Sequence, residues 1–142
     1  MQEILDDPSL NGLKPDNTAI KVLIADDAMF FRRAIRRFLE GAGYEVIGEA
    51  ANGEEVIKLY QELKPDVVTM DITMPVIDGI EATGRIVAEH PGAKIVMISS
   101  TGKKNMLKDA IRQGARNFVE KPITRGNVKG FLTIVKKVFN QK

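Results

Sequence analysis

Short apolar segments alternate with longer amphipathic segments along most of the chain. The short segments have the length and the aliphatic content of buried strands, and they cover residues 21–25, 44–50, 66–70, 94–99 and 117–120. In the longer segments apolar residues recur at intervals of three and four, which predicts helices at 29–40, 53–63, 79–90, 103–113 and 125–140. This alternation of five strands with five helices predicts an α/β domain whose parallel sheet is covered on both faces.

The first part of the chain lacks this pattern. Residues 1–19 contain the turn formers Pro8, Asn11–Gly12 and Pro15 but no long periodic segment. We therefore expect an N-terminal tail at 1–19, either flexible or holding a short helix, and one domain at 20–142. A length of 142 residues suits a single domain of this kind.

The charge balance does not indicate a nucleic-acid-binding protein. The chain is 44% hydrophobic and 28% charged, with a net charge of +2. Its densest basic cluster predicts the solvated face of an amphipathic helix and consists of Arg32, Arg33, Arg36 and Arg37.

Other features restrict the metal chemistry and the cellular location. The chain has no cysteine and one histidine, so disulfides, thiolate metal sites and multi-histidine sites are excluded within one chain. No apolar run approaches the roughly 20 residues that span a bilayer. The acidic start also lacks the order of a signal peptide. We expect a cytoplasmic protein that binds neither a membrane nor nucleic acid.

Charged and hydroxyl side chains follow the predicted strands at the points where the strands end. The set comprises Asp26, Asp27, Asp71, Ser99 and Lys121. Ligands of parallel α/β sheets bind beyond the carboxyl ends of the strands, so these side chains are expected to meet at one edge. Clustered carboxylates need a cation or a shared proton, and their oxygens suit Mg²⁺. A lysine suits a phosphoryl oxygen, and an aspartate can attack phosphorus to form an aspartyl phosphate.

The same residues carry a resemblance to a known family. Asp26–Asp27, the stretch Asp71-Ile-Thr-Met-Pro with Asp78–Gly79, Ser99 and Lys121–Pro122 resemble the CheY-like receiver domains of two-component response regulators. The resemblance covers about residues 20–140. It implies a flavodoxin-like, doubly wound sheet with strand order 2-1-3-4-5 and a cis peptide bond before Pro122. It also implies a stand-alone receiver of the chemotaxis type.

The resemblance assigns a metal site and a phosphoacceptor. Asp71 would accept the phosphoryl group and would also face the metal. Asp27 would be a direct metal ligand, and Asp26 would act directly or through a bound water. The backbone carbonyl of Thr73 would complete the protein ligands. The implied metal is Mg²⁺, with Mn²⁺ as a substitute.

Phosphoryl binding and output are implied by the same resemblance. Ser99 and Lys121 would contact the phosphoryl group, and a movement of Ser99 would change the rotamer of Phe118. Thr73 and Thr101 occupy positions associated with the speed of dephosphorylation. The output surface would be formed by the helix at 103–113, the strand at 117–120 and the helix from 125. Basic side chains on it suggest a partner with acidic flanks: Lys103, Lys104, Lys108, Arg112, Lys129 and Lys136.

The implied function is that of a monomeric signalling protein rather than an enzyme with a separate substrate. A sensor histidine kinase would supply the phosphoryl group, the domain would catalyse its own phosphorylation and dephosphorylation, and a protein partner would bind the output surface. Chemotaxis is the expected pathway. The alternative is a phosphorelay or another two-component pathway.

Three other interpretations share the expected architecture. An FMN-binding flavodoxin would need a hydroxyl- and glycine-rich phosphate loop, where this chain has Asp26-Asp27-Ala28-Met29. A phosphatase with an aspartyl nucleophile usually has a second acid where Thr73 stands. A degenerate receiver that acts only as a scaffold is disfavoured by the intact set of site residues.

His90, expected to be exposed at a helix end, is a poor candidate for phosphorylation.

Overall fold

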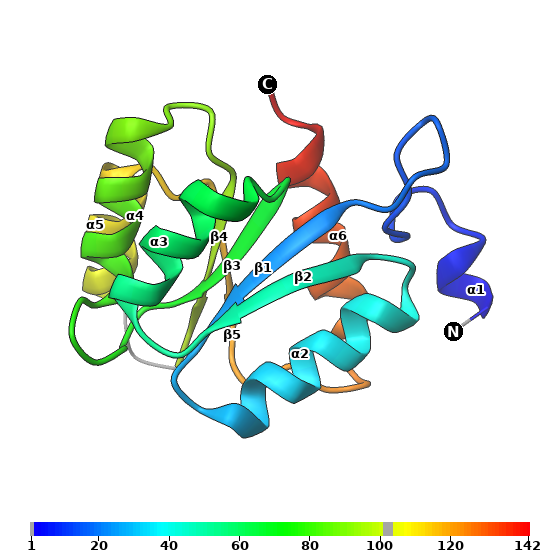
Figure 1. Ribbon diagram of the computed structural model, residues 1–142. Coiled ribbons are helices and arrows are strands. Elements are labelled where there is room, and N and C mark those ends of the chain that lie inside the picture. Colours follow the sequence, from blue (N-terminus) through cyan, green and yellow to red (C-terminus); the bar gives the residue numbers. More distant parts are fainter. Residues whose placement is uncertain (1, 101–103) are drawn as a thin grey trace.

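The computed structural model describes residues 2–100 and 104–142 (Figure 1). Thr101 and Lys103 therefore lie outside the described residues. The elements follow one another in the order α1 (Gln2–Leu5), β1 (Lys21–Ala25), α2 (Met29–Gly41), β2 (Glu45–Ala50), α3 (Gly53–Leu63), β3 (Val67–Asp71), α4 (Gly79–Glu89), β4 (Ile95–Ser99), α5 (Lys104–Gln113), β5 (Asn117–Glu120) and α6 (Val128–Asn140).

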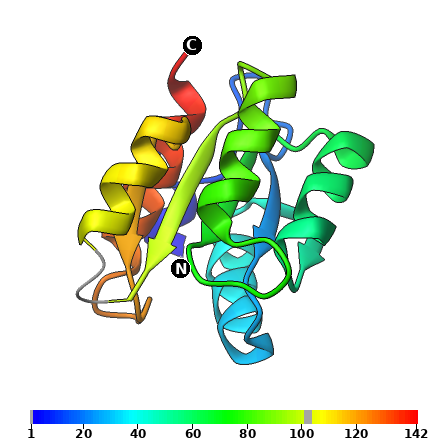
Figure 2. The same ribbon diagram turned by 90° about the vertical axis from the view of Figure 1, so that its left-hand side faces the viewer.

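The five strands form one parallel sheet in the order β2-β1-β3-β4-β5, which confirms the expected topology. Helices α2 and α6 cover one face, and α3, α4 and α5 cover the other (Figures 1 and 2). Every residue of β3 and β4 is buried, as expected for central strands that are covered on both faces. No helix among the described residues combines the length and the apolar character needed to cross a membrane.

Two details of the helices differ from the sequence-based expectation. The described part of the chain contains six helices instead of five, because the tail holds the short helix α1. The last helix begins at Val128 instead of residue 125. The Asn127 side chain accepts a hydrogen bond from the Thr124 backbone N–H at 2.6 Å, and this contact holds residues 124–127 in a turn.

The N-terminal segment packs on the domain. Ile4 of α1 and Leu10 are buried in the core cluster on the α2 and α6 face of the sheet. The Ile20 N–H donates to the Gly12 carbonyl at 2.7 Å, which closes the segment into a loop. A Cβ atom at Gly12 would lie 2.4 Å from the Tyr44 ring, so only glycine allows this approach. The segment thus lies against the end of the sheet away from the acidic edge.

A buried lysine fastens this segment to α6. Lys136 is only 8% exposed, and its ammonium donates to the Asn11 carbonyl at 2.6 Å and to the Leu13 carbonyl at 2.9 Å. The Asn11 side-chain oxygen accepts a third contact at 3.1 Å. Burial lowers the pKa of Lys136 from its ordinary value. Lys136 was expected among the cations of the output surface, and that expectation is wrong, because its charge is turned toward residues 11–13.

We predict that Lys136→Met destabilises the folded protein by about 1–3 kcal/mol, because the substitution leaves two backbone carbonyls without their donor. Residues 1–19 should then be cleaved faster in limited proteolysis. Urea denaturation measures the first effect and mass spectrometry of the digest the second. The control is Lys137→Met on the exposed side of the same helix. Equal behaviour of the two variants would contradict the proposed anchor.

Candidate functional site

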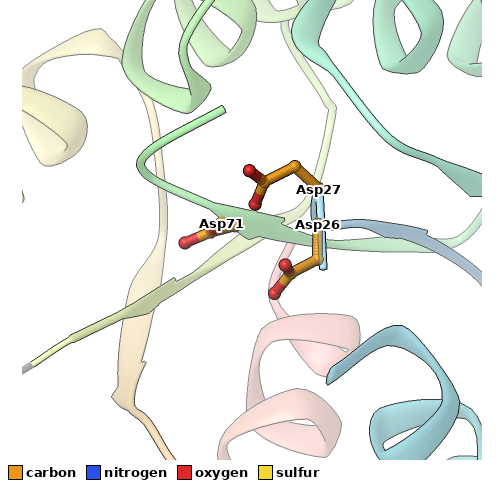
Figure 3. Close-up of side chains that lie close together, drawn as sticks. All are labelled: Asp26, Asp27 and Asp71. Atoms are coloured by element: carbon orange, nitrogen blue, oxygen red, sulfur yellow. The ribbon is translucent and has the colours of Figure 1, made fainter. Parts of the chain in front are cut away.

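Three carboxylates gather at the carboxyl edge of the sheet (Figure 3). One oxygen from each of Asp26, Asp27 and Asp71 lies within 4.8 Å of the others. Asp26 and Asp27 follow β1, and Asp71 ends the neighbouring strand β3, whose Met70 is in register with Ala25. Asp26 and Asp71 are 1% and 6% exposed, whereas Asp27 is open to solvent. The structure thus brings together the three acids that the strand ends predicted.

Asp26 is held by the start of α2. Its Oδ1 accepts a hydrogen bond from the Ala28 backbone N–H at 2.9 Å. Arg32 donates to the Asp26 carbonyl at 2.7 Å and also pairs with Glu49 at 3.1 Å. Arg32 was expected on a solvated helix face, but it supports the site instead. The N-cap of α2 is Ala28, and the preceding Asp27 is exposed, so its carboxylate is accessible to a ligand.

Lys121 supplies the positive charge of the site. Its Nζ lies 2.8 Å from Asp26 Oδ2 and 3.4 Å from Asp71 Oδ2. The Lys121 backbone N–H donates to the Ser99 carbonyl at 2.7 Å, and the Lys121–Pro122 peptide bond is cis, as the resemblance implies. The lysine therefore bridges two carboxylates, and β4 fixes its backbone.

Ser99 and Phe118 lie on neighbouring strands but face different surroundings. Ser99 is buried at the end of β4, directly after Ile98, which is in register with Asp71. Phe118 on β5 is 44% exposed, and it points outward into a surface cavity of about 510 Å³. The cavity is also lined by Lys104, Leu107, Lys108, Ile111 and Arg112. Thr101, the expected second tuning residue, lies outside the described residues.

The loop after Asp71 folds back onto that residue. Asp78 caps α4 by accepting a hydrogen bond from the Glu81 N–H at 2.8 Å, and the Gly79 N–H donates to the Ile72 carbonyl at 2.7 Å. A Cβ atom at Gly79 would lie 2.0 Å from the Asp71 carbonyl oxygen. The Asp78–Gly79 pair thus closes the loop that carries the exposed Thr73, a structural role that the motif alone did not reveal.

The surroundings of Asp71 disfavour its ionised form. Burial, together with the charge of Asp26, raises the pKa of Asp71 from 3.8 to about 6. Lys121 acts in the opposite direction but offsets only part of this rise. A further cation close to Asp71 would therefore stabilise its ionised form. Three carboxylate oxygens at this spacing also match the preference of hard divalent ions for oxygen ligands.

His90 lies outside this cluster. It was expected to be exposed, but it is only partly so, because its ring packs on Tyr60 with the centroids 5.0 Å apart. It follows α4, at the opposite end of that helix from the Asp78 cap. The structure therefore gives it no contact with the acids.

Comparison with known proteins agrees with this geometry. The family described as the response regulator receiver domain matches residues 22–133. The chain belongs to this family. This receiver domain is 48% identical over 109 residues to the chemotaxis protein CheY of Listeria monocytogenes, covering 77% of this chain and 92% of that protein. It is 47% identical over 117 residues to CheY of Thermotoga maritima, covering 82% of this chain and 98% of that protein.

Solved structures are similar to this receiver domain over most of its length. CheY in the CheX–CheY–BeF₃–Mg²⁺ complex from Borrelia burgdorferi has a TM-score of 0.84 and 34% identity, covering 92% of this chain and 97% of that chain. The response regulator domain of Thermotoga maritima CheB has a TM-score of 0.80 and 33% identity, covering 87% and 98%. Membership of the receiver family replaces the flavodoxin and phosphatase interpretations.

We predict that the stability of the metal-free receiver depends on pH through Asp71. Its folded pKa of about 6 lies above the ordinary value of 3.8, so the cost of ionising Asp71 in the folded protein begins near pH 4 and reaches its full size above about pH 7. This penalty disappears as pH falls from about 7 to 4. At pH 7.5, Asp71→Asn should therefore raise the free energy of unfolding by on the order of 2 kcal/mol, with a smaller gain at pH 5.

Denaturation in EDTA at pH 7.5, 6 and 5 measures this difference. The control is Asp109→Asn, which removes an exposed acid on α5. A constant difference between the parent and Asp71→Asn at all three pH values would contradict the raised pKa.

Proposed function

We propose that this receiver accepts a phosphoryl group on Asp71 from a phosphohistidine of a sensor histidine kinase. The observation that carries the proposal is the convergence of three carboxylates and one lysine on the same sheet edge, with Asp71 buried among them. An Asp71 oxygen would form a bond to phosphorus while the bond between phosphorus and the donor nitrogen breaks. The electron pair of that bond would stay on the donor imidazole.

Mg²⁺ is the proposed cofactor, with Mn²⁺ as a substitute. It would be held by Asp26, Asp27, Asp71 and the backbone carbonyl of Thr73. When bound, it neutralises charge on the phosphoryl oxygens and on the acids. The crowding of the carboxylates supports this assignment, because a second cation would offset both the burial and the charge of Asp26 that raise the pKa of Asp71.

Lys121 and Ser99 are the proposed partners of the phosphoryl group. The Lys121 ammonium is 3.4 Å from Asp71 Oδ2, so a short movement would bring it to a phosphoryl oxygen on that residue. The Ser99 hydroxyl, at the end of the next strand, would donate to another oxygen. Thr73 and Thr101 are proposed to tune self-catalysed dephosphorylation.

The proposed output surface is formed by α5, β5 and α6. Movement of Ser99 toward the phosphoryl group would leave space behind β4, which Phe118 would fill by turning inward. The outward Phe118 lines an apolar cavity whose rim carries Lys104, Lys108 and Arg112. This chemistry suits a protein partner with an apolar anchor and acidic flanks, bound by one receiver domain as a monomer.

Chemotaxis is the proposed pathway, and the similarity to several CheY proteins supports it. The alternative is a phosphorelay or another two-component pathway.

Phosphorylation of the isolated protein tests the proposal. With Mg²⁺ and acetyl phosphate, the mass should increase by one phosphoryl group that hydroxylamine removes. Asp71→Asn should remove all labelling, because an amide is not a nucleophile here. Asp27→Asn should require more Mg²⁺ for the same rate, whereas Asp109→Asn should behave like the parent. Undiminished labelling of Asp71→Asn would refute the assignment.

We further predict that Ser99→Ala separates phosphorylation from output. The variant should still be labelled, more slowly, but should lose most of the NMR shift changes of residues 104–140 on addition of beryllofluoride and Mg²⁺. The alanine side chain has no hydroxyl group that could move toward the phosphoryl group and donate a hydrogen bond to it. A response as large as that of the parent would mean that the switch does not depend on Ser99.

A further inference from the structure

An aromatic ring forms a third contact of the site lysine. The Lys121 Nζ lies 4.3 Å from the centroid of the Phe31 ring, within the distance at which a cation is attracted to a ring face. The same ammonium lies between Asp26 Oδ2 and Asp71 Oδ2. The Lys121 side chain is only 11% exposed, so this attraction is weakly screened by water.

Phe31 is not an ordinary core residue. It lies in the first turn of α2, is partly exposed, and belongs to neither buried core cluster. Its neighbour Phe30 is 78% exposed and meets it edge to face, with the centroids 5.7 Å apart. Packing in the core therefore does not explain the position of the Phe31 ring.

The start of α2 places Phe31 close to the acids. Asp26 accepts from the Ala28 N–H, and Arg32, the residue after Phe31, donates to the Asp26 carbonyl. The backbone that carries Phe31 thus lies between two residues that are hydrogen bonded to Asp26. In the observed position, the Lys121 ammonium contacts both carboxylates and lies over this ring.

We propose that Phe31 is a positioning residue for Lys121, and that its ring face holds the ammonium where it can pass from Asp71 to an incoming phosphoryl oxygen. A lysine has a flexible four-carbon stem, and its ammonium is a point charge without a preferred hydrogen-bond geometry. A ring face attracts that charge over a range of positions, so the ammonium keeps this stabilisation while its oxygen partner changes.

A test must separate this attraction from simple packing of the ring on the lysine stem. Fluorination of the ring keeps its shape but weakens the negative charge of its face. We would place 4-fluoro-, 3,5-difluoro- and 3,4,5-trifluorophenylalanine at position 31, and the same residues at position 30 as the matched control. Phe31→Leu and Phe30→Leu remove each ring entirely.

The first measurement uses the metal-free protein, so it does not rest on the proposed function. NMR of the Lys121 ¹³Cε group, assigned with Lys121→Arg, should show an upfield shift from the ring and low mobility in the parent. Phe31→Leu should lose the upfield shift and raise the mobility, whereas Phe30→Leu should leave both unchanged. Unaltered Lys121 signals in Phe31→Leu would overturn the proposal.

The second measurement rests on the proposed function and is the rate of labelling by acetyl phosphate at saturating Mg²⁺. The rate should fall stepwise with each added fluorine at position 31, to about fivefold below the parent for the trifluoro ring. Fluorination at position 30 should have no effect. Parent-like rates throughout the position 31 series, with a slow Phe31→Leu, would show that only ring volume matters and would overturn the proposal. If the parent itself is not labelled, the proposed function fails, while the NMR measurement still decides the role of Phe31.

Discussion

The repulsion between buried carboxylates at the carboxyl edge of the sheet is the constraint on which the rest of the site depends. A parallel sheet brings the ends of β1 and β3 side by side, so the carboxylates of Asp26 and Asp71 lie close together. Burial strengthens their interaction and raises the pKa of Asp71. One ammonium, that of Lys121, is shared between them and offsets only part of the repulsion. The carboxylates therefore carry more negative charge than Lys121 neutralises, and a bound divalent ion would neutralise the rest.

The scaffold around the acids holds this unfavourable cluster in place. The fully buried strand β3 carries Asp71, and the loop after it returns so closely that Gly79 has no room for a side chain. Arg32 fixes the backbone of Asp26 from the first turns of α2. At the other end of the sheet, Lys136 fastens residues 11–13 to α6. Hydrophobic burial and these polar anchors stabilise the fold, while the ionised form of Asp71 opposes it.

The sequence predicted the sheet and its acidic edge because both follow from local rules. Strands appear as short apolar runs, and the residues after them share one edge whatever their distance along the chain. Contacts that depend on side-chain direction were not predictable in this way. Lys136 on an amphipathic helix looks solvated until residues 11–13 fold over it. Phe31 looks like one of several apolar residues of α2 until Lys121 is found over its ring. Helix α6 starts at Val128, later than the spacing of apolar residues predicts, because the Asn127 side chain holds the preceding residues in a turn.

The site and the proposed output surface are connected through the neighbouring strands β4 and β5. Lys121 follows directly after β5, the strand that carries Phe118, and its backbone is hydrogen bonded to Ser99 at the end of β4. A change of ammonium position at the acids and a change of ring position at the surface therefore act on the same strand pair. The proposed switch can shift the population of the Phe118 rotamers only by as much as the phosphoryl group prefers one arrangement of Ser99 and Lys121 over the other. A ring at position 31 that stabilises the ammonium in both arrangements would have little effect on the equilibrium between them. It would mainly affect the rate at which Lys121 passes from one to the other.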